Sequence, residues 1–310
     1  MKKFSVILLL YNSDNDAIKK TIDSIVCQKD VEAEIILSDD CSKNQCVEYA
    51  VEYLKDIGYN NHKVLTHPEN VGTTQNIYDA LELVSNKYLK CIGAGDLLYS
   101  ENTLSDIYDF MEAEKCTMCF GKIQAFYVDG NGNNCLIPYF LPSDIKAFQK
   151  GKADTVKANI IKNHGWIIGA SMFYETSGFK KYLAQILDSV RYCEDLLQVT
   201  LLLNDEKISL YPKGAVYYEV GSGISTNQSG PSPRLVKDHS KFWSMLIKKY
   251  PDNKLVKKGY YMQRLQSINE PLRRKLAIIL HNPGYIIMML KTKAQKKRYE
   301  IKEKGILLFY

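Results

Sequence analysis

The chain has 310 residues, of which 45% are hydrophobic and 25% charged, and its formal net charge is +6. This length can bury a full core, so the sequence predicts one large α/β domain or one domain with a helical appendage. No segment is long and apolar enough to span a bilayer. The eight cysteines are interpreted as reduced thiols of a cytosolic protein, because a chain of this size needs no disulfide staples.

The charge is distributed unevenly along the chain. Residues 234–310 hold 19 of the 41 Lys and Arg residues but only 5 of the 35 Asp and Glu residues. This asymmetry indicates two parts with different partners. We therefore divide the chain into residues 1–230 and a basic helical extension, residues 231–310.

The chain begins with Met1-Lys-Lys and the apolar run Phe4–Leu10, which imitates a signal peptide. No small-residue cleavage site follows, and a buried parallel strand explains the run better. Strand-like and helix-like runs then alternate, which predicts a mainly parallel sheet with helices on both faces. The predicted strands are Phe4–Leu10, Ala33–Leu37, Lys63–Thr66 and Tyr88–Ile92, and the predicted helices are Asp16–Cys27, Lys43–Leu54 and Val71–Val84.

The middle of the chain is less regular. Met118–Val128 and Asn134–Leu141 flank a Gly/Asn turn and predict a hairpin. A continuous helix is predicted over Lys181–Leu203, followed by the strand Ile208–Leu210.

Polar residues follow the predicted strands, where ligands bind in a parallel sheet. Each group also has a simpler interpretation, because acids after strands cap helices, short polar stretches form turns, and helix acids can be merely solvated. In chain order the groups are Tyr11-Asn12, Asp39-Asp40, Asn70-Val-Gly72 with Asn76, Gly95-Asp96, Glu194-Asp195 and Gly221–Ser225.

As an ordered set, these groups resemble the family 2 glycosyltransferases, inverting enzymes with the GT-A fold, of the bacterial surface-polysaccharide type. The resemblance covers Lys3 to Thr226 and rests on SVILLLYN, EIILSDDCS, NVGTTQN, GAGD, YCED and GSGIST. The sequence departs from the family pattern in three places. Leu10 replaces the usual Pro, Gln75 replaces a common Arg, and the acidic cluster after the fourth strand is reduced to Asp96.

The resemblance implies a nucleotide site for a UDP-sugar. Tyr11 would stack on uracil, and Asp39 or Asp40 would accept its N–H. Asn12, Asn70, Gly72, Asn76 and Gly95 would complete the nucleotide-binding set. Asp96 would hold a divalent metal, Mn²⁺ or Mg²⁺, since these ions need only one or two carboxylates beside phosphate oxygens.

The resemblance also implies catalytic and acceptor-side residues. Asp195 would act as general base, with Glu194 as its neighbour or substitute. His164, Trp166 and Gly169 would lie on the acceptor side, although a packed Trp and a surface His explain the first two as well.

The basic extension pairs apolar helical segments with Lys and Arg, a pattern that suits an anionic membrane surface. A helix pair packed on the domain with a solvated basic face is the alternative, and no motif indicates nucleic-acid binding. We therefore expect a cytoplasmic protein that is peripheral on the inner face of the cell membrane.

The expected function is transfer of a sugar from a nucleotide-sugar to a hydroxyl of a glycan or lipid-linked glycan, in capsule, O-antigen or other cell-surface polysaccharide synthesis. A non-catalytic nucleotide-sugar-binding module is the alternative that the thinned acidic cluster suggests, although simple binding would not need Glu194-Asp195. A dinucleotide-dependent dehydrogenase is disfavoured, because Tyr11-Asn-Ser-Asp14 stands where a Gly-rich phosphate turn would be.

Overall fold

A mixed β-sheet forms the centre of the protein. The computed structural model describes residues 1–138, 144–221, 232–301 and 305–306. Within these residues the strand order is β3-β2-β1-β4-β8-β6-β9-β5, with β7 paired to β6. Strands β3, β2, β1 and β4 run parallel, β8 is antiparallel to β4 and β6, and β9 is parallel to β6. The bounds are β1 Lys2–Leu10, β2 Val31–Asp39, β3 His62–Thr66, β4 Tyr88–Gly93, β5 Leu97–Leu98, β6 Met118–Val128, β7 Asn134–Ile137, β8 Met172–Glu175 and β9 Ile208–Glu219.

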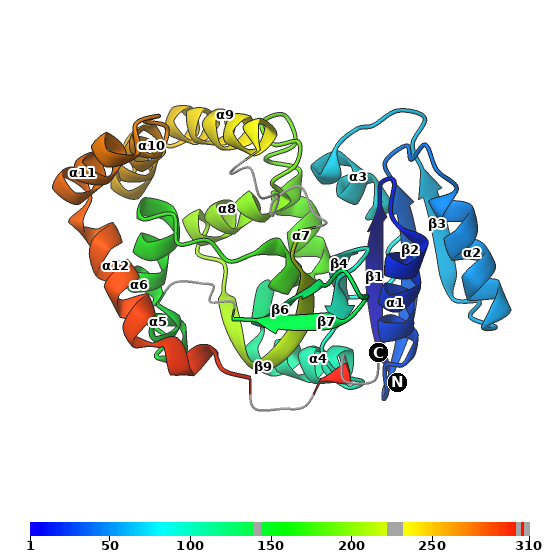
Figure 1. The fold of residues 1–310 in the computed structure, drawn as a ribbon. Helices are drawn as coiled ribbons and strands as arrows, with labels where there is room; N and C mark the ends of the chain where they lie inside the picture. The colour runs from blue at the N-terminus through cyan, green and yellow to red at the C-terminus, as the bar shows by residue number, and fades with distance from the viewer. Residues whose placement is uncertain (139–143, 222–231, 302–304, 307–310) are drawn as a thin grey trace.

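Helices cover both faces of this sheet (Figure 1). Alternate residues of β1 point to opposite faces, so Val6 and Leu8 join one hydrophobic cluster while Ile7 joins the other. Both sides of the strand are thus buried, as its unbroken apolar run predicts. The helices are α1 Asn15–Val26, α2 Cys46–Asp56, α3 Thr73–Ala80, α4 Thr103–Glu114, α5 Ile145–Gln149, α6 Ala153–Lys157, α7 Thr176–Leu183, α8 Leu197–Leu203, α9 Pro233–Lys249, α10 Lys254–Gln266, α11 Pro271–His281 and α12 Pro283–Ala294.

The alternating strands and helices of the first hundred residues are confirmed, and β6 and β7 form the predicted hairpin. The last predicted strand extends from Ile208 to Glu219, well beyond Leu210. This extension carries the strand to the edge of the sheet where the polar groups collect.

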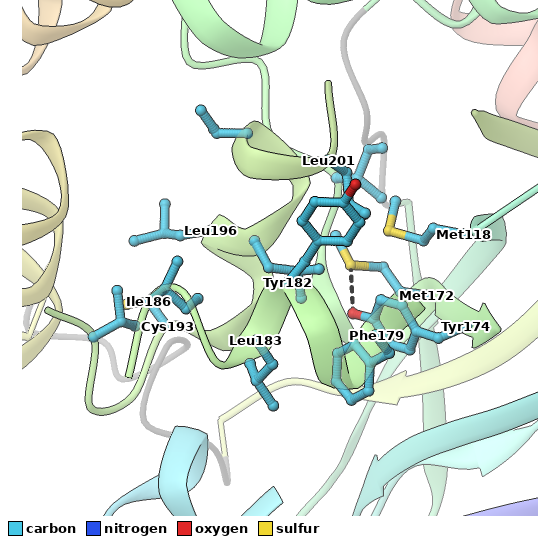
Figure 2. Packing of buried hydrophobic residues seen from close by; sticks show 14 of the residues in the cluster. Met118, Met172, Tyr174, Phe179, Tyr182, Leu183, Ile186, Cys193, Leu196 and Leu201 are labelled. Carbon is cyan, nitrogen blue, oxygen red and sulfur yellow. Dashed lines mark hydrogen bonds between the residues drawn. The ribbon is translucent and has the colours of Figure 1, made fainter. Parts of the chain in front are cut away.

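The predicted continuous helix Lys181–Leu203 is wrong. Helix α7 ends at Leu183, and a turn of 3₁₀ helix over Glu194–Leu196 precedes α8. The apolar spacing imitated one helix because residues on both sides of the break, such as Leu183 and Leu201, belong to one hydrophobic cluster (Figure 2). The break places Glu194 and Asp195 on a connection at the sheet edge, outside any long helix.

Helices α9 to α12 follow one another around the end of the molecule opposite α2 (Figure 1). From α9 and α10, Phe242, Trp243 and Val256 are fully buried in the cluster that also contains Ile7 of β1. The first two helices of the basic extension therefore share the core of the sheet. None of the helices in the described part of the chain is long and apolar enough to cross a membrane.

Gly259 allows α10 to pack closely on its neighbours. A Cβ added there would lie 2.3 Å from the Ile161 carbonyl oxygen and 2.3 Å from the Trp243 ring. We expect Gly259→Ala to lower the free energy of unfolding by about 1–3 kcal/mol, because overpacking outweighs the better helix propensity of Ala. Urea unfolding measures this, with Lys258→Ala on the exposed side of the same helix as control. A Gly259→Ala protein as stable as the control would contradict this packing.

Candidate active site

Asp40, directly after β2, holds the turn Asn70-Val71-Gly72. Its carboxylate accepts hydrogen bonds from the backbone N–H of Val71 (2.6 Å) and Gly72 (2.9 Å) and from Nδ2 of Asn70 (2.8 Å). Burial raises the pKa of Asp40, and the two backbone N–H groups act in the opposite direction. The turn is thereby fixed to the end of the neighbouring strand.

Arg191 joins this turn to the other half of the site. Its backbone carbonyl accepts from Thr74 N–H at 3.0 Å, and its guanidinium donates to the Asn70 carbonyl at 2.5 Å. Gly72 has a φ of +90°, and a Cβ there would lie 2.3 Å from Cγ of Arg191. Only glycine meets both constraints, the left-handed backbone and the close approach.

Three other predicted nucleotide residues build the frame of the site. Asp39 accepts from the backbone N–H and the hydroxyl of Ser42. Asn12, with a φ of +50°, accepts from Lys43 N–H at 2.7 Å. Asn76 accepts from the Ser38 hydroxyl at 2.7 Å and is buried. These contacts shape the loops around the strand ends.

A small cavity of about 90 Å³ opens between these loops. Its lining includes Tyr11, Asp40 and Asn70, together with Tyr192 and Arg234. The Arg234 guanidinium lies 5.6 Å from the Tyr192 ring centroid, and Tyr11 is 47% exposed. Sequence reasoning missed Tyr192 and Arg234, since Arg234 is one of many basic residues in its region. A larger cavity of about 820 Å³, lined by Phe148, Lys207 and Pro212 among others, includes none of the predicted site residues.

Asp96 follows the short turn after β4 and meets a second carboxylate. Its Oδ1 accepts from the backbone N–H of Glu219 at 3.0 Å, 123 residues away in the sequence. Gly95 has a φ of +101°, and a Cβ there would lie 2.1 Å from Oε2 of Glu219. The Glu219 side chain therefore covers Gly95 beside Asp96. No local pattern marked Glu219, because the predicted strand ended nine residues earlier.

Burial, and to a smaller extent the negative charge of Glu219, raise the pKa of Asp96 to about 7. The carboxylates of Asp96 and Glu219 provide the oxygen ligands that Mg²⁺ and Mn²⁺ prefer. No group of three or more His, Cys, Asp or Glu side chains suited to a metal occurs among the described residues. Asp96 and Glu219 are therefore the residues that could hold a divalent cation here.

Glu194 and Asp195 lie between two core residues, Cys193 and Leu196, which Figure 2 shows in the buried cluster. The backbone N–H of Gly169 donates to the Asp195 carboxylate. Burial raises the pKa of Asp195 to about 6, despite this bond. Burial, and next the charge of Asp195, raise the pKa of Glu194 to about 8. With its pKa raised to about 6, the Asp195 carboxylate can accept a proton near neutral pH.

Asp238 of α9 fixes the loop that leads to this pair. Its Oδ2 accepts from three successive backbone N–H groups, those of Arg191 (3.0 Å), Tyr192 (2.5 Å) and Cys193 (3.2 Å). These N–H groups are consequently unavailable for a helix, which explains the break between α7 and α8. Asp238 is a functional-site residue that sequence reasoning missed.

The predicted acceptor-side residues lie together but differ in exposure. His164 is 7% exposed and packs against Trp166 and Trp243, at centroid distances of 4.7 and 4.8 Å. Its ring nitrogens face Gln266 Oε1 and the Gly259 carbonyl. Burial lowers the pKa of His164 to about 4, so the ring is neutral. Trp166 is half-buried, and Gly169 packs against Glu194. Of Gly221–Ser225, residues 222–225 lie outside the described residues.

Comparisons with known proteins agree with this arrangement. The model of the family "Glycosyl transferase family 2" matches residues 5–183. Two relatives, the poly(ribitol-phosphate) beta-N-acetylglucosaminyltransferase TarS of Staphylococcus aureus strains Mu50 and MW2, are each 23% identical over 221 residues. The match spans 70% of this chain but 35% of each relative, about a third of their length.

Two solved structures share the fold. S. aureus TarS 1-349 in complex with UDP-GlcNAc superposes with a TM-score of 0.57 at 18% identity, covering 96% of this chain and 81% of that one. The mannosyltransferase PcManGT from Pyrobaculum calidifontis, in complex with GDP-Man and Mn²⁺, gives a TM-score of 0.55 at 11% identity, covering 95% and 86%. The predicted GT-A fold and the predicted enzyme class are confirmed. Because the family model spans more than half of the sequence, this chain belongs to glycosyl transferase family 2.

Proposed function

We propose that the enzyme is an inverting transferase that moves a sugar from a UDP-sugar to a hydroxyl of a glycan or lipid-linked glycan. The observation that carries this proposal is the half-buried Glu194–Asp195 pair, which the Arg191 loop ties to the nucleotide-side turn. The name of TarS and its UDP-GlcNAc complex support a UDP-sugar donor and an acceptor on a cell-surface polymer. Cell-surface polysaccharide synthesis, of the capsule or O-antigen kind, is the expected context.

In this proposal the nucleotide occupies the cavity at Tyr11. The exposed Tyr11 ring stacks on the base. The Asp40 carboxylate accepts a hydrogen bond from the N–H of the base, using lone pairs that are not engaged by the Asn70–Gly72 turn. Asp39, Asn12 and Asn76 shape the pocket from outside, and Asn70, Gly72 and Gly95 bring backbone close to the nucleotide. Arg234 offers a guanidinium that suits phosphate oxygens.

Asp96 and Glu219 would hold a divalent metal, Mn²⁺ or Mg²⁺. When bound, the metal would supply Lewis-acid stabilisation of the departing diphosphate. The structurally similar PcManGT was solved in complex with GDP-Man and Mn²⁺, which supports the use of a divalent cation.

Asp195 takes the proton in the transfer step. The acceptor oxygen forms a bond to the anomeric carbon while the bond to the UDP oxygen breaks, and the leaving oxygen keeps the electron pair. The hydroxyl proton goes to the Asp195 carboxylate, and attack from the face opposite UDP inverts the anomeric centre. Trp166 and Gly169 border the acceptor side, with His164 supporting the Trp166 ring.

The basic extension would place the enzyme at an anionic membrane surface, on the cytoplasmic face. Helix α11 exposes Leu272, Leu276 and Leu280 (72%, 52% and 75%), spaced four residues apart on one face. Arg273, Arg274 and Lys275 lie on the same helix, and α12 adds exposed Ile287 and Leu290. Exposed apolar side chains beside basic ones fit the boundary between acyl chains and anionic headgroups.

Asp195→Asn tests the proposed base. We expect kcat to fall about 10²–10⁴-fold with UDP affinity unchanged, because the amide cannot accept the proton. In the unsubstituted enzyme kcat/KM should fall as the pH drops through about 6, where Asp195 becomes protonated. Steady-state transfer kinetics and calorimetric UDP titration check both, with the exposed Asp188→Asn as control. Equal losses of turnover and UDP affinity would make Asp195 structural and favour a non-catalytic binding module.

UDP titration with Mn²⁺ and with EDTA tests the metal site. We expect at least about tenfold tighter binding with Mn²⁺. Asp96→Asn or Glu219→Gln should each reduce that gain, since each removes one of two oxygen ligands. Glu101→Gln, a carboxylate outside the site, is the control. UDP binding that is independent of Mn²⁺ in every variant would rule out the metal site.

Vesicle flotation tests the membrane surface. Leu276→Glu/Leu280→Glu should abolish binding to vesicles that contain phosphatidylserine, because burying carboxylates in the headgroup region is unfavourable. Val236→Glu, an exposed apolar position on α9, is the matched control. Point variants are preferable to truncation, which would also remove the buried Met288 and Tyr299. Unchanged flotation of the double variant would contradict the proposed surface.

A further inference from the structure

Lys90 is a buried cation in the middle of β4. It is 0% exposed and pairs in the sheet with Val6 of β1, a position where a parallel strand normally carries an apolar residue. Its ammonium lies 5.1 Å from the Phe173 ring centroid and donates to the Ala170 carbonyl at 2.6 Å. Burying a lysine costs stability, so this residue needs a reason other than packing.

The contacts of Lys90 lead to the proposed base in two steps. Ala170 is the middle residue of the 3₁₀ turn Gly169–Ser171, and the Gly169 N–H donates to the Asp195 carboxylate. A Cβ on Gly169 would lie 2.7 Å from Oε1 of Glu194, so the same turn packs against both acids. The Lys90 ammonium thus anchors the short segment on which Glu194 and Asp195 rest.

The charge of Lys90 also acts on the site. Burial lowers the pKa of Lys90 to about 8, while the carboxylates of Asp96 and Glu194 and the thiols of Cys91 and Cys119 counteract this shift. In return, the ammonium lowers the raised pKa values of Glu194 and Asp96. Around Glu194 the other charged groups are Asp195 and Asp238, both of which make its ionisation harder.

We propose that Lys90 is a positioning residue for transfer, which fixes the Gly169–Ser171 turn under Asp195 and places a positive charge near the Glu194–Asp195 pair. The inference rests on the proposed role of Asp195 as base. It assigns to Lys90 a positive charge inside the protein, separate from any metal at Asp96.

Three variants separate the two contributions. Lys90→Met removes the hydrogen bond and the charge, Lys90→Gln keeps a donor for Ala170 without charge, and Lys90→Arg keeps the charge. Lys55→Met, an exposed lysine on α2, is the matched control. Carboxyl ¹³C NMR over a pH series measures protonation of the pair, and thermal unfolding and transfer kinetics are recorded on the same proteins.

For Lys90→Met we expect the upper apparent pKa of the pair to rise by about one unit, because the pair loses its buried cation. The acid limb of the pH profile of kcat should move to higher pH with it. At neutral pH kcat should fall about tenfold or more, with a smaller change in KM. Thermal stability should be equal or higher, since a buried charge is exchanged for an apolar side chain. Lys90→Gln should shift the titration of the Glu194–Asp195 pair in the same way but lose less activity than Lys90→Met. Lys90→Arg should leave the titration of the pair as it is in the unsubstituted protein.

A folded Lys90→Met protein with unchanged titration and unchanged kcat would overturn the inference. A second outcome would also overturn the inference. If Lys90→Met and Lys90→Gln both lose stability and Lys90→Gln shows no shift in the titration of the pair, Lys90 is a structural residue. The NMR titration does not depend on turnover. If the unsubstituted protein transfers no sugar, the proposed function fails, whereas a shifted titration would still support the role of Lys90.

Discussion

Three successive backbone N–H groups converge on one carboxylate oxygen of Asp238, and the active site depends on that interaction. It ends the helical run after α7 and turns the chain so that Arg191 reaches the Asn70–Gly72 turn. Cys193 and Leu196 then enter the core on either side of the acidic pair. Without a buried acceptor at this place, the apolar spacing of residues 181–203 would favour a continuous helix. The proposed base would then sit on a helix face.

The charges of the site are arranged in pairs. Asp96 meets Glu219, Glu194 meets Asp195, and each pair is partly removed from water, so the pKa values of Asp96, Glu194 and Asp195 are all raised. Lys90 lies where it acts on members of both pairs. A nucleotide diphosphate brings further negative charge. If the proposed site is right, donor and cation would bind together, because a cation would relieve the repulsion between the carboxylates.

The sequence predicts the sheet well because its signals are local. Apolar runs such as Phe4–Leu10 reach the buried centre of a parallel sheet, and polar residues follow at the strand ends. Long-range partners leave no such signal. Asp238 lies 45–47 residues from the loop that it holds, and Glu219 lies 123 residues from Asp96. His164 illustrates the converse, since a polar residue beside a Trp suggested a surface loop and instead packs inside the protein against two indole rings.

The first turns of α9 carry both Arg234, which lines the cavity at Tyr11, and Asp238, which holds the loop before the acidic pair. In the proposed function, this one helix would contribute to donor binding and to catalysis while it also begins the basic extension. Chimaeras between relatives that are joined at residue 230 would pair the loop of one parent with the helix of the other. Such proteins would inherit a working site only where both parents place a carboxylate and a guanidinium one helical turn apart, so a junction after α10 is the natural point of exchange.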